Sequence, residues 1–127
     1  MERKRVFMIL ALTALTVMLT RAQEVKVPLR FDSYYSYEKM TEAMKALSTA
    51  YPEFTKLDEV GRSEEGRIIW ALTINNPKTG EPFSKPGVYV DGNIHGNEIQ
   101  AGEDCLYLAN RLQTNYGKIT EINDDVD

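Results

Sequence analysis

Residues 85–112 constrain the fold of this chain more than any other stretch, because they place a short apolar run, a glycine-rich turn and a long amphipathic segment in direct succession. The apolar run at residues 88–90 predicts a short buried strand. Asp-Gly-Asn at 91–93 breaks this run, and from about Asn97 the apolar spacing becomes helical. We therefore expect a strand, a tight turn and a helix in this order.

The turn carries His95, the only histidine in the chain, and Glu98 three residues later. Imidazole nitrogen and carboxylate oxygen bind zinc at about 2.0–2.2 Å, and a catalytic zinc usually takes three ligands from the protein. The pair follows a predicted strand, at the edge of an open α/β sheet where ligands bind, and Gly92, Gly96 and Gly102 allow close approach of backbone to an ion or substrate. The residues alone leave two interpretations open, a metal site or a hydrogen-bonded loop histidine.

The preceding part of the chain predicts a helix and a hairpin. Ser36 is a suitable N-cap for a helix of about 14 residues that Pro52 ends. Strands are predicted at 55–61 and 68–75, joined by a turn in which Gly66 adopts a positive φ. The second strand is a nearly unbroken apolar run, which is typical of a strand covered on both faces.

The helix after Glu98 has an inner face that includes Cys105, which we interpret as a small buried hydrophobe rather than a nucleophile. Glu103 and Asp104 are predicted on the opposite, solvent-facing side. Gly117 suits the position just past the C-terminus of the helix, and residues 118–127 predict a solvated tail or an interrupted element.

Taken together, the order helix, strand, strand, strand, helix predicts the α/β class. The last strand and helix form half of a crossover unit whose return strand is missing. Three strands covered on both faces need more layers than two helices supply, so we expect an incomplete structure.

The N-terminus predicts export. A basic opening, an apolar run of 14 residues at 6–19 and small residues before Gln23 indicate a signal peptide at residues 1–22, with an uncleaved anchor or a buried helix as alternatives. Residues 23–33 are predicted to be a linker. Without residues 1–22, the chain has 11 basic residues against 18 acidic ones, a net charge of −7. This charge argues against nucleic acid or an anionic membrane as partner.

Four motifs in this order and spacing resemble the zinc metallocarboxypeptidases, the carboxypeptidase A/B and N/E-like family. They are Tyr51-Pro52, the stretch 61–69 (Gly-Arg-Ser-Glu-Glu-Gly-Arg-Ile-Ile), the stretch 85–88 (Lys-Pro-Gly-Val) and His95-Gly96-Asn97-Glu98. The resemblance covers roughly residues 34–117. It implies that residues 34–127 are the truncated N-terminal part of a catalytic domain, with the family's mixed-sheet α/β sandwich fold and the elements helix, hairpin, strand and helix.

The resemblance also implies one Zn²⁺ ion, bound by His95, Glu98 and a further histidine. The expected reaction is hydrolysis of the C-terminal peptide bond of peptides or proteins through a zinc-activated water. No catalytic residue is assigned within the chain, because the family's general base is expected beyond Asp127. Asn97 either contacts substrate or shapes the turn, and Arg67 matches a family position that we interpret as structural. We expect a secreted or periplasmic monomer, and no activity from the 127 residues alone.

Two other functions remain open from the sequence. Zinc amidohydrolases that act on N-acyl amino acids resemble this family and share the His-Gly-Asn-Glu turn. A non-catalytic binding module that retains the scaffold without a complete site is the third possibility. Hydrolysis of a peptide with a free C-terminus, compared with hydrolysis of an N-acyl amino acid, distinguishes the two enzymes.

Overall fold

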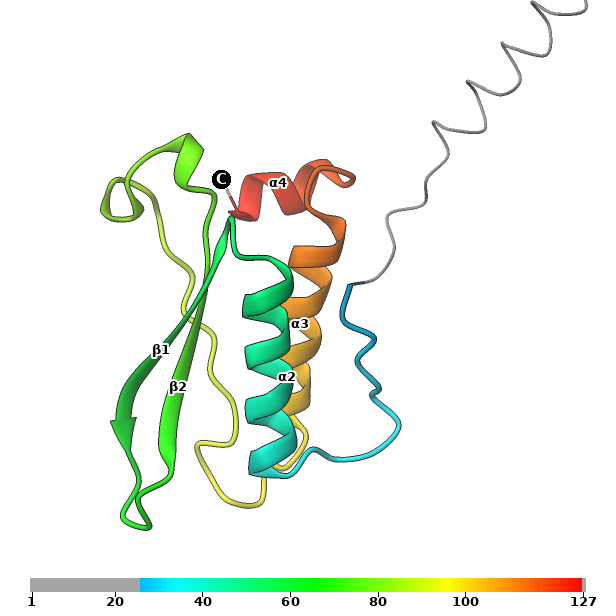
Figure 1. Ribbon diagram of the computed structural model, residues 1–127, viewed down its shortest axis with the longest axis vertical. Coiled ribbons are helices and arrows are strands. Elements are labelled where there is room, and N and C mark those ends of the chain that lie inside the picture. The colour runs from blue at the N-terminus through cyan, green and yellow to red at the C-terminus, as the bar shows by residue number, and fades with distance from the viewer. Residues whose placement is uncertain (1–25, 127) are drawn as a thin grey trace, which may run out of the picture.

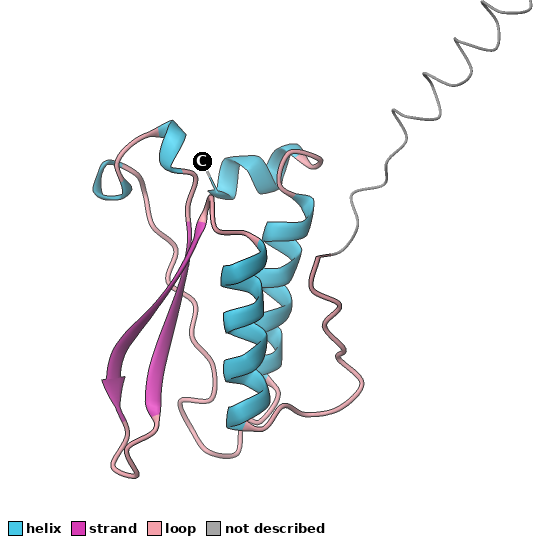
Figure 2. Cartoon of the chain, in the orientation of Figure 1, coloured by secondary structure: helices cyan, strands magenta, loops and turns pink. Residues whose placement is uncertain are grey.

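A computed structural model describes residues 26–126, which form a small mixed α/β structure (Figures 1 and 2). The predicted signal peptide, residues 1–22, lies outside the described residues. Within residues 26–126, no helix has the length and apolar character needed to span a membrane. The elements in order are α2 (Tyr37–Ala50), β1 (Thr55–Arg62), β2 (Ile68–Ile74), the short 3₁₀ helices η1 (Pro77–Thr79) and η2 (Pro82–Ser84), α3 (Ala101–Asn115) and α4 (Thr120–Val126).

Helix α2 begins and ends where the sequence predicts. The hydroxyl of Ser36 accepts a hydrogen bond from the backbone N–H of Lys39 at 3.3 Å, which satisfies one of the unpaired donors of the first turn. The helix ends at Ala50, two residues before Pro52. Figure 1 shows α2 alongside α3, with the β1–β2 hairpin on its other side.

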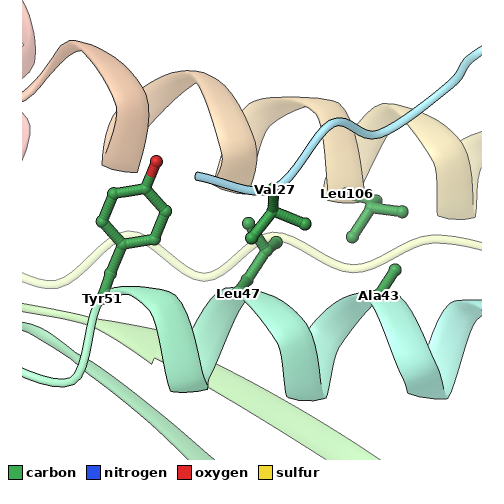
Figure 3. Close-up of a cluster of buried hydrophobic side chains, with 5 residues drawn as sticks. All are labelled: Val27, Ala43, Leu47, Tyr51 and Leu106. Atoms are coloured by element: carbon green, nitrogen blue, oxygen red, sulfur yellow. The ribbon is translucent and has the colours of Figure 1, made fainter. Parts of the chain in front are cut away.

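The main core lies between α2 and α3 (Figure 3). Its buried members are Val27, Ala43, Leu47, Tyr51 and Leu106. Val27 comes from the segment predicted to be a linker, and it inserts between the two helices. This segment therefore packs onto the helix pair through a core residue.

The hairpin is antiparallel, as predicted, with Thr55 opposite Ile74 and Arg62 opposite Ile68. Its turn contains Gly66 at a φ of 78°, a conformation that glycine adopts without steric cost. The prediction that the second strand is covered on both faces is wrong for the described residues, because Ile69 is exposed. Helix α2 contacts the hairpin, and residues 26–126 supply no second layer for the opposite face.

The predicted third strand, residues 88–90, is also not observed. The sheet within residues 26–126 has only β1 and β2, and residues Val88 and Tyr89 are 90% and 86% exposed. A buried strand needs a hydrogen-bonding neighbour and an apolar layer, and the described residues provide neither at this position. The predicted mixed sheet is therefore present only as a two-stranded antiparallel hairpin.

Helix α3 differs from its prediction in two respects. It begins at Ala101 rather than near Asn97, because residues 94–100 form turns. Glu103, predicted to face solvent, is only 8% exposed, and its Oε1 accepts a hydrogen bond from the backbone N–H of Tyr35 at 2.6 Å. The segment that precedes α2 covers this side of α3, a long-range contact that helical periodicity does not reveal.

The C-terminal residues form an element rather than a solvated tail. Gly117 has a φ of 80°, as expected just past the end of α3. Helix α4 then buries Ile122 and Val126, and the carbonyl of Val126 accepts a hydrogen bond from the backbone N–H of Asn76 at 3.0 Å. This contact links the end of the described chain to the residues that follow β2.

Candidate metal centre

The loop between the exposed segment 88–90 and α3 carries both residues predicted as metal ligands. In Figure 1 this loop lies near the N-terminal ends of α2 and α3. It turns twice within residues 94–100, with the N–H of Glu98 bonded to the carbonyl of His95 at 3.0 Å and the N–H of Ala101 bonded to the carbonyl of Glu98 at 3.1 Å. These turns bring the side chains of His95 and Glu98 to the same side of the loop.

The imidazole of His95 and the carboxylate of Glu98 are in direct contact. Nδ1 of His95 lies 2.9 Å from Oε1 of Glu98, and the backbone N–H of His95 donates to Oε2 at 3.1 Å. The carboxylate is thus held by two interactions with one residue. A nitrogen and an oxygen that already converge in this way suit a shared divalent cation, which would replace the hydrogen bond between them.

The two donors fit part of a zinc coordination shell. Zinc sites in proteins use imidazole nitrogen and carboxylate oxygen, and need three or four protein ligands. Among residues 26–126, no group of three or more His, Cys, Asp or Glu side chains is placed to hold a metal ion. The side chains of His95 and Glu98 are 73% and 46% exposed, so both are accessible to further ligands. The described residues therefore offer two candidate ligands for a metal ion, fewer than a zinc site normally uses.

The hydrogen bonds from His95 lower the pKa of the Glu98 carboxyl below its usual value of 4.5. The side-chain hydrogen bond is the largest cause, followed by the backbone hydrogen bond, and both favour the ionised form. A folded-state pKa below the unfolded value means that this contact stabilises the loop above the unfolded pKa, and that the stabilisation is lost as the pH falls through the folded pKa.

We predict that the Glu98 side chain titrates with a midpoint below 4.5 when it is followed by NMR between pH 2 and 7. His95→Ala should move the midpoint upward toward 4.5, because it removes the larger of the two hydrogen bonds and leaves the backbone donor in place. A midpoint for Glu98 at or above 4.5 in the native chain would contradict the contact.

The other residues named from the sequence lie outside this pair. Asn97 is exposed in the turn beside Glu98. Arg67 pairs with Glu65 at 2.5 Å and lies over the ring of Tyr37 at 6.0 Å, which fits a structural role in the hairpin turn. Cys105 is partly buried, and burial, followed by the nearby charges of Asp91 and Asp104, raises the pKa of its thiol. A thiol with a raised pKa is a poor nucleophile at neutral pH.

Sequence reasoning missed one residue of the loop. Asn93 was predicted only as a strand breaker, yet it has a positive φ and its side chain bonds to the start of α3. The Gly-Asn dipeptide before the turn was the available signal, since asparagine tolerates the left-handed region better than most residues.

A histidine and a glutamate that converge in an open loop ahead of a helix are ligand types of zinc hydrolases. The model of one such family, described as "Zinc carboxypeptidase", matches residues 40–127, and the chain belongs to this family. The resemblance drawn from the four sequence motifs is thereby confirmed.

Individual relatives agree with the family match. The chain is 38% identical over 95 residues to carboxypeptidase D of Homo sapiens, 32% identical over 94 residues to carboxypeptidase B of Astacus astacus, and 31% identical over 84 residues to carboxypeptidase Z of Rattus norvegicus. These alignments cover 74%, 74% and 66% of this chain, but only 7%, 30% and 13% of the respective relatives. The chain thus spans less than a third of the length of each of these three relatives.

Proposed function

We propose that this chain is the N-terminal part of a zinc-dependent carboxypeptidase, which in complete form hydrolyses the C-terminal peptide bond of peptides. His95 and Glu98 are its two ligands to a single Zn²⁺ ion. The observation that carries the proposal is the 2.9 Å approach of the His95 ring to the Glu98 carboxylate in the loop before α3. Membership of the zinc carboxypeptidase family supports the choice of metal and reaction.

Within this site, the role of the chain's own residues is to bind the metal ion and to hold its ligands in the required orientation. His95 offers a ring nitrogen, and its backbone N–H donates to the second oxygen of Glu98, which leaves Oε1 directed at the ring. When bound, the zinc ion polarises the scissile carbonyl and lowers the pKa of a water molecule. We assign the third ligand, the general base and the cationic groups that capture the substrate carboxylate to polypeptide beyond Asp127. Asn97 lies beside the pair and is proposed to contact substrate.

The exposed apolar surface supports this assignment. Val88 and Tyr89 have strand-forming side chains, but within residues 26–126 they have neither a neighbouring strand nor an apolar cover. Contiguous exposed apolar residues mark a surface that becomes buried against further protein. We infer that additional strands and helices of the catalytic domain cover this segment, and that the same polypeptide completes the metal site.

We also propose that the protein is exported to the cell exterior or the periplasm as a monomer, after removal of residues 1–22. The basic opening followed by a 14-residue apolar run supports export and cleavage. Mass spectrometry of the protein recovered from the secreted or periplasmic fraction tests the proposal directly, since the mature chain should begin at Gln23. Recovery of the intact N-terminus would contradict cleavage.

The metal assignment predicts weak zinc binding by the 127-residue chain, because two ligands are fewer than a zinc site normally uses. His95→Ala should weaken binding at least about tenfold, since even outer-shell partners of a metal contribute 10–100-fold. Binding is measured by NMR titration with Zn²⁺, followed at the imidazole C–H resonances in the native chain and at the backbone amides of residues 94–100 in every variant. Glu64→Ala, which removes an exposed carboxylate in the hairpin turn, is the matched control and should bind as the native chain does.

The reaction is tested on the complete protein, which includes the sequence that follows Asp127. It should release the last residue of a peptide with a free C-terminus, leave the same peptide intact when its C-terminus is amidated, and not hydrolyse an N-acyl amino acid. Treatment with a chelator should abolish turnover, and added Zn²⁺ should restore it. Hydrolysis of the N-acyl amino acid in preference to the peptide would replace the proposed function with that of an amidohydrolase.

A further inference from the structure

We propose that Asn93 is a positioning residue for the metal loop, and that together with Gly92 and Gly102 it forms a neck that fixes where His95 and Glu98 stand relative to α3. The proposal rests on the proposed function for its metal readout, but its geometry is independent of the metal. The neck is defined here as residues 92–93 and 101–102, which close the loop at its two ends.

The side chain of Asn93 joins the two ends of the loop. Its Oδ1 accepts a hydrogen bond from the backbone N–H of Gly102 at 2.8 Å, across nine positions of sequence. Asn93 also has a φ of 64° and is the only non-glycine residue within the described part of the chain with a positive φ. A residue in this region of φ/ψ space is uncommon and marks a site that the surrounding structure determines. The strained backbone and the hydrogen bond occur at the same residue.

The glycines of the neck allow backbone to pack directly against backbone. A Cβ atom at Gly92 would lie 2.5 Å from the carbonyl oxygen of Ala101, a distance that folded proteins do not contain. A Cβ atom at Gly102 would lie 3.3 Å from Nδ2 of Asn93 and 3.3 Å from Cε of Met40, so this position is also closely surrounded. The neck is therefore in contact with α2 as well as with α3.

Little else holds the metal-binding pair in place. The side chains of His95 and Glu98 are 73% and 46% exposed, and the hydrogen bonds of these side chains are made within the pair. Residues 94–100 are otherwise linked to α3 through backbone hydrogen bonds from the N–H of Ala101 to the carbonyl of Glu98 and from the N–H of Asp104 to the carbonyl of Gln100. A binding site needs its groups within about 0.5 Å of their productive positions, and exposed side chains gain no such precision from packing. The neck supplies the fixed ends from which the two turns place the pair.

Three substitutions separate the roles of Asn93. Asn93→Gly keeps the positive φ accessible but removes the side-chain acceptor. Asn93→Asp keeps an acceptor oxygen and a residue type that tolerates the left-handed region, and its charge is favourable near a helix N-terminus. Gly87→Ala is the control outside the loop, because a Cβ there meets no atom within 4 Å and its φ is not in the left-handed region.

The experiment uses the full chain and two readouts, Zn²⁺ affinity from the NMR titration of His95, and hydrogen exchange of the His95 backbone amide, which donates to Glu98. We expect Asn93→Gly to weaken Zn²⁺ binding about fivefold and to accelerate exchange of the His95 amide by a similar factor, in the range of a lost capping hydrogen bond. Asn93→Asp should restore both values to within about twofold of the native chain, and Gly87→Ala should leave both unchanged.

The outcomes distinguish this proposal from the proposed function. If Asn93→Gly had the same Zn²⁺ affinity and the same His95 amide exchange rate as the native chain, the proposed positioning role of Asn93 would be wrong. Faster exchange of the Gly102 amide alone, with His95 unaffected, would also overturn it, because the hydrogen bond would then stabilise only the start of α3. If the native chain shows no response to Zn²⁺ while exchange at His95 follows the substitutions as expected, the positioning role stands and the zinc assignment fails.

Discussion

Replacing Leu47 with alanine is expected to lower the free energy of unfolding by about 2–5 kcal/mol, the range for large-to-small substitutions at well-packed positions. Leu47 is 0% exposed and lies at the centre of the cluster between α2 and α3 (Figure 3). Its neighbours come from three separate parts of the chain, namely α2, α3 and the segment around Val27. They cannot all collapse into the space that the substitution leaves. Urea denaturation followed by circular dichroism measures the change.

Val60→Ala is the matched control for Leu47→Ala, because it also shortens an aliphatic side chain but at an exposed position of β1. This substitution should change the free energy of unfolding by no more than about 0.5 kcal/mol. A loss at Leu47 no larger than the loss at Val60 would show that the two helices do not share the core described here.

Gly92→Ala is expected to destabilise the chain by about 1–3 kcal/mol, the range for forcing an extra group into a packed position. The cause is the 2.5 Å separation between the added Cβ and the carbonyl oxygen of Ala101. Both partners belong to the backbone, so no side chain can rotate away, and the loop must separate from the start of α3. The same denaturation experiment measures stability, and amide chemical shifts of residues 94–102 report the displacement.

Gly96→Ala makes the same chemical change four residues later, where the added methyl group meets open space. We expect the free energy of unfolding to change by no more than about 0.5 kcal/mol, and chemical-shift changes to be limited to the immediate neighbours of residue 96. If Gly92→Ala behaved like Gly96→Ala, the close contact between residue 92 and residue 101 would be absent in solution.

Elements with local signals were predictable from the sequence. Helix α2 has a capping serine, an apolar stripe and a terminating proline, all within a few residues of its ends. The hairpin has a nearly unbroken apolar run in its second strand and a glycine at the turn position that needs a positive φ. Each of these signals acts over short sequence distances, so the remainder of the chain does not alter the outcome.

Features that depend on distant residues were not predictable. Helical periodicity placed Glu103 on the outer face of α3, because it contains no information about the segment near Tyr35 that covers it. The apolar run at 88–90 has the composition of a buried strand, but burial requires a neighbouring strand, and residues 26–126 contain none at that position. The composition of a segment shows that it favours burial, but whether it is buried depends on the neighbouring strands and helices of the tertiary structure.

The candidate site was predictable in part. The spacing of His95 and Glu98 in a glycine-rich turn was enough to propose that they converge, and the structure brings them into contact. Whether they bind zinc stays a prediction. The hydrogen bond from Gly102 to Asn93 was not predictable, because it depends on the exact path of the loop between them.

The exposed segment around Tyr89 also determines how the chain behaves at high concentration. It has no strand partner within residues 26–126, and its side chains are apolar. Such a segment is a template for pairing between molecules. Pro86, which has no N–H to donate, and the charge of Asp91 restrict any such ladder to a few residues. We therefore expect the solubility of the isolated chain to depend on the exposed residues 88–90 as well as on its net negative charge.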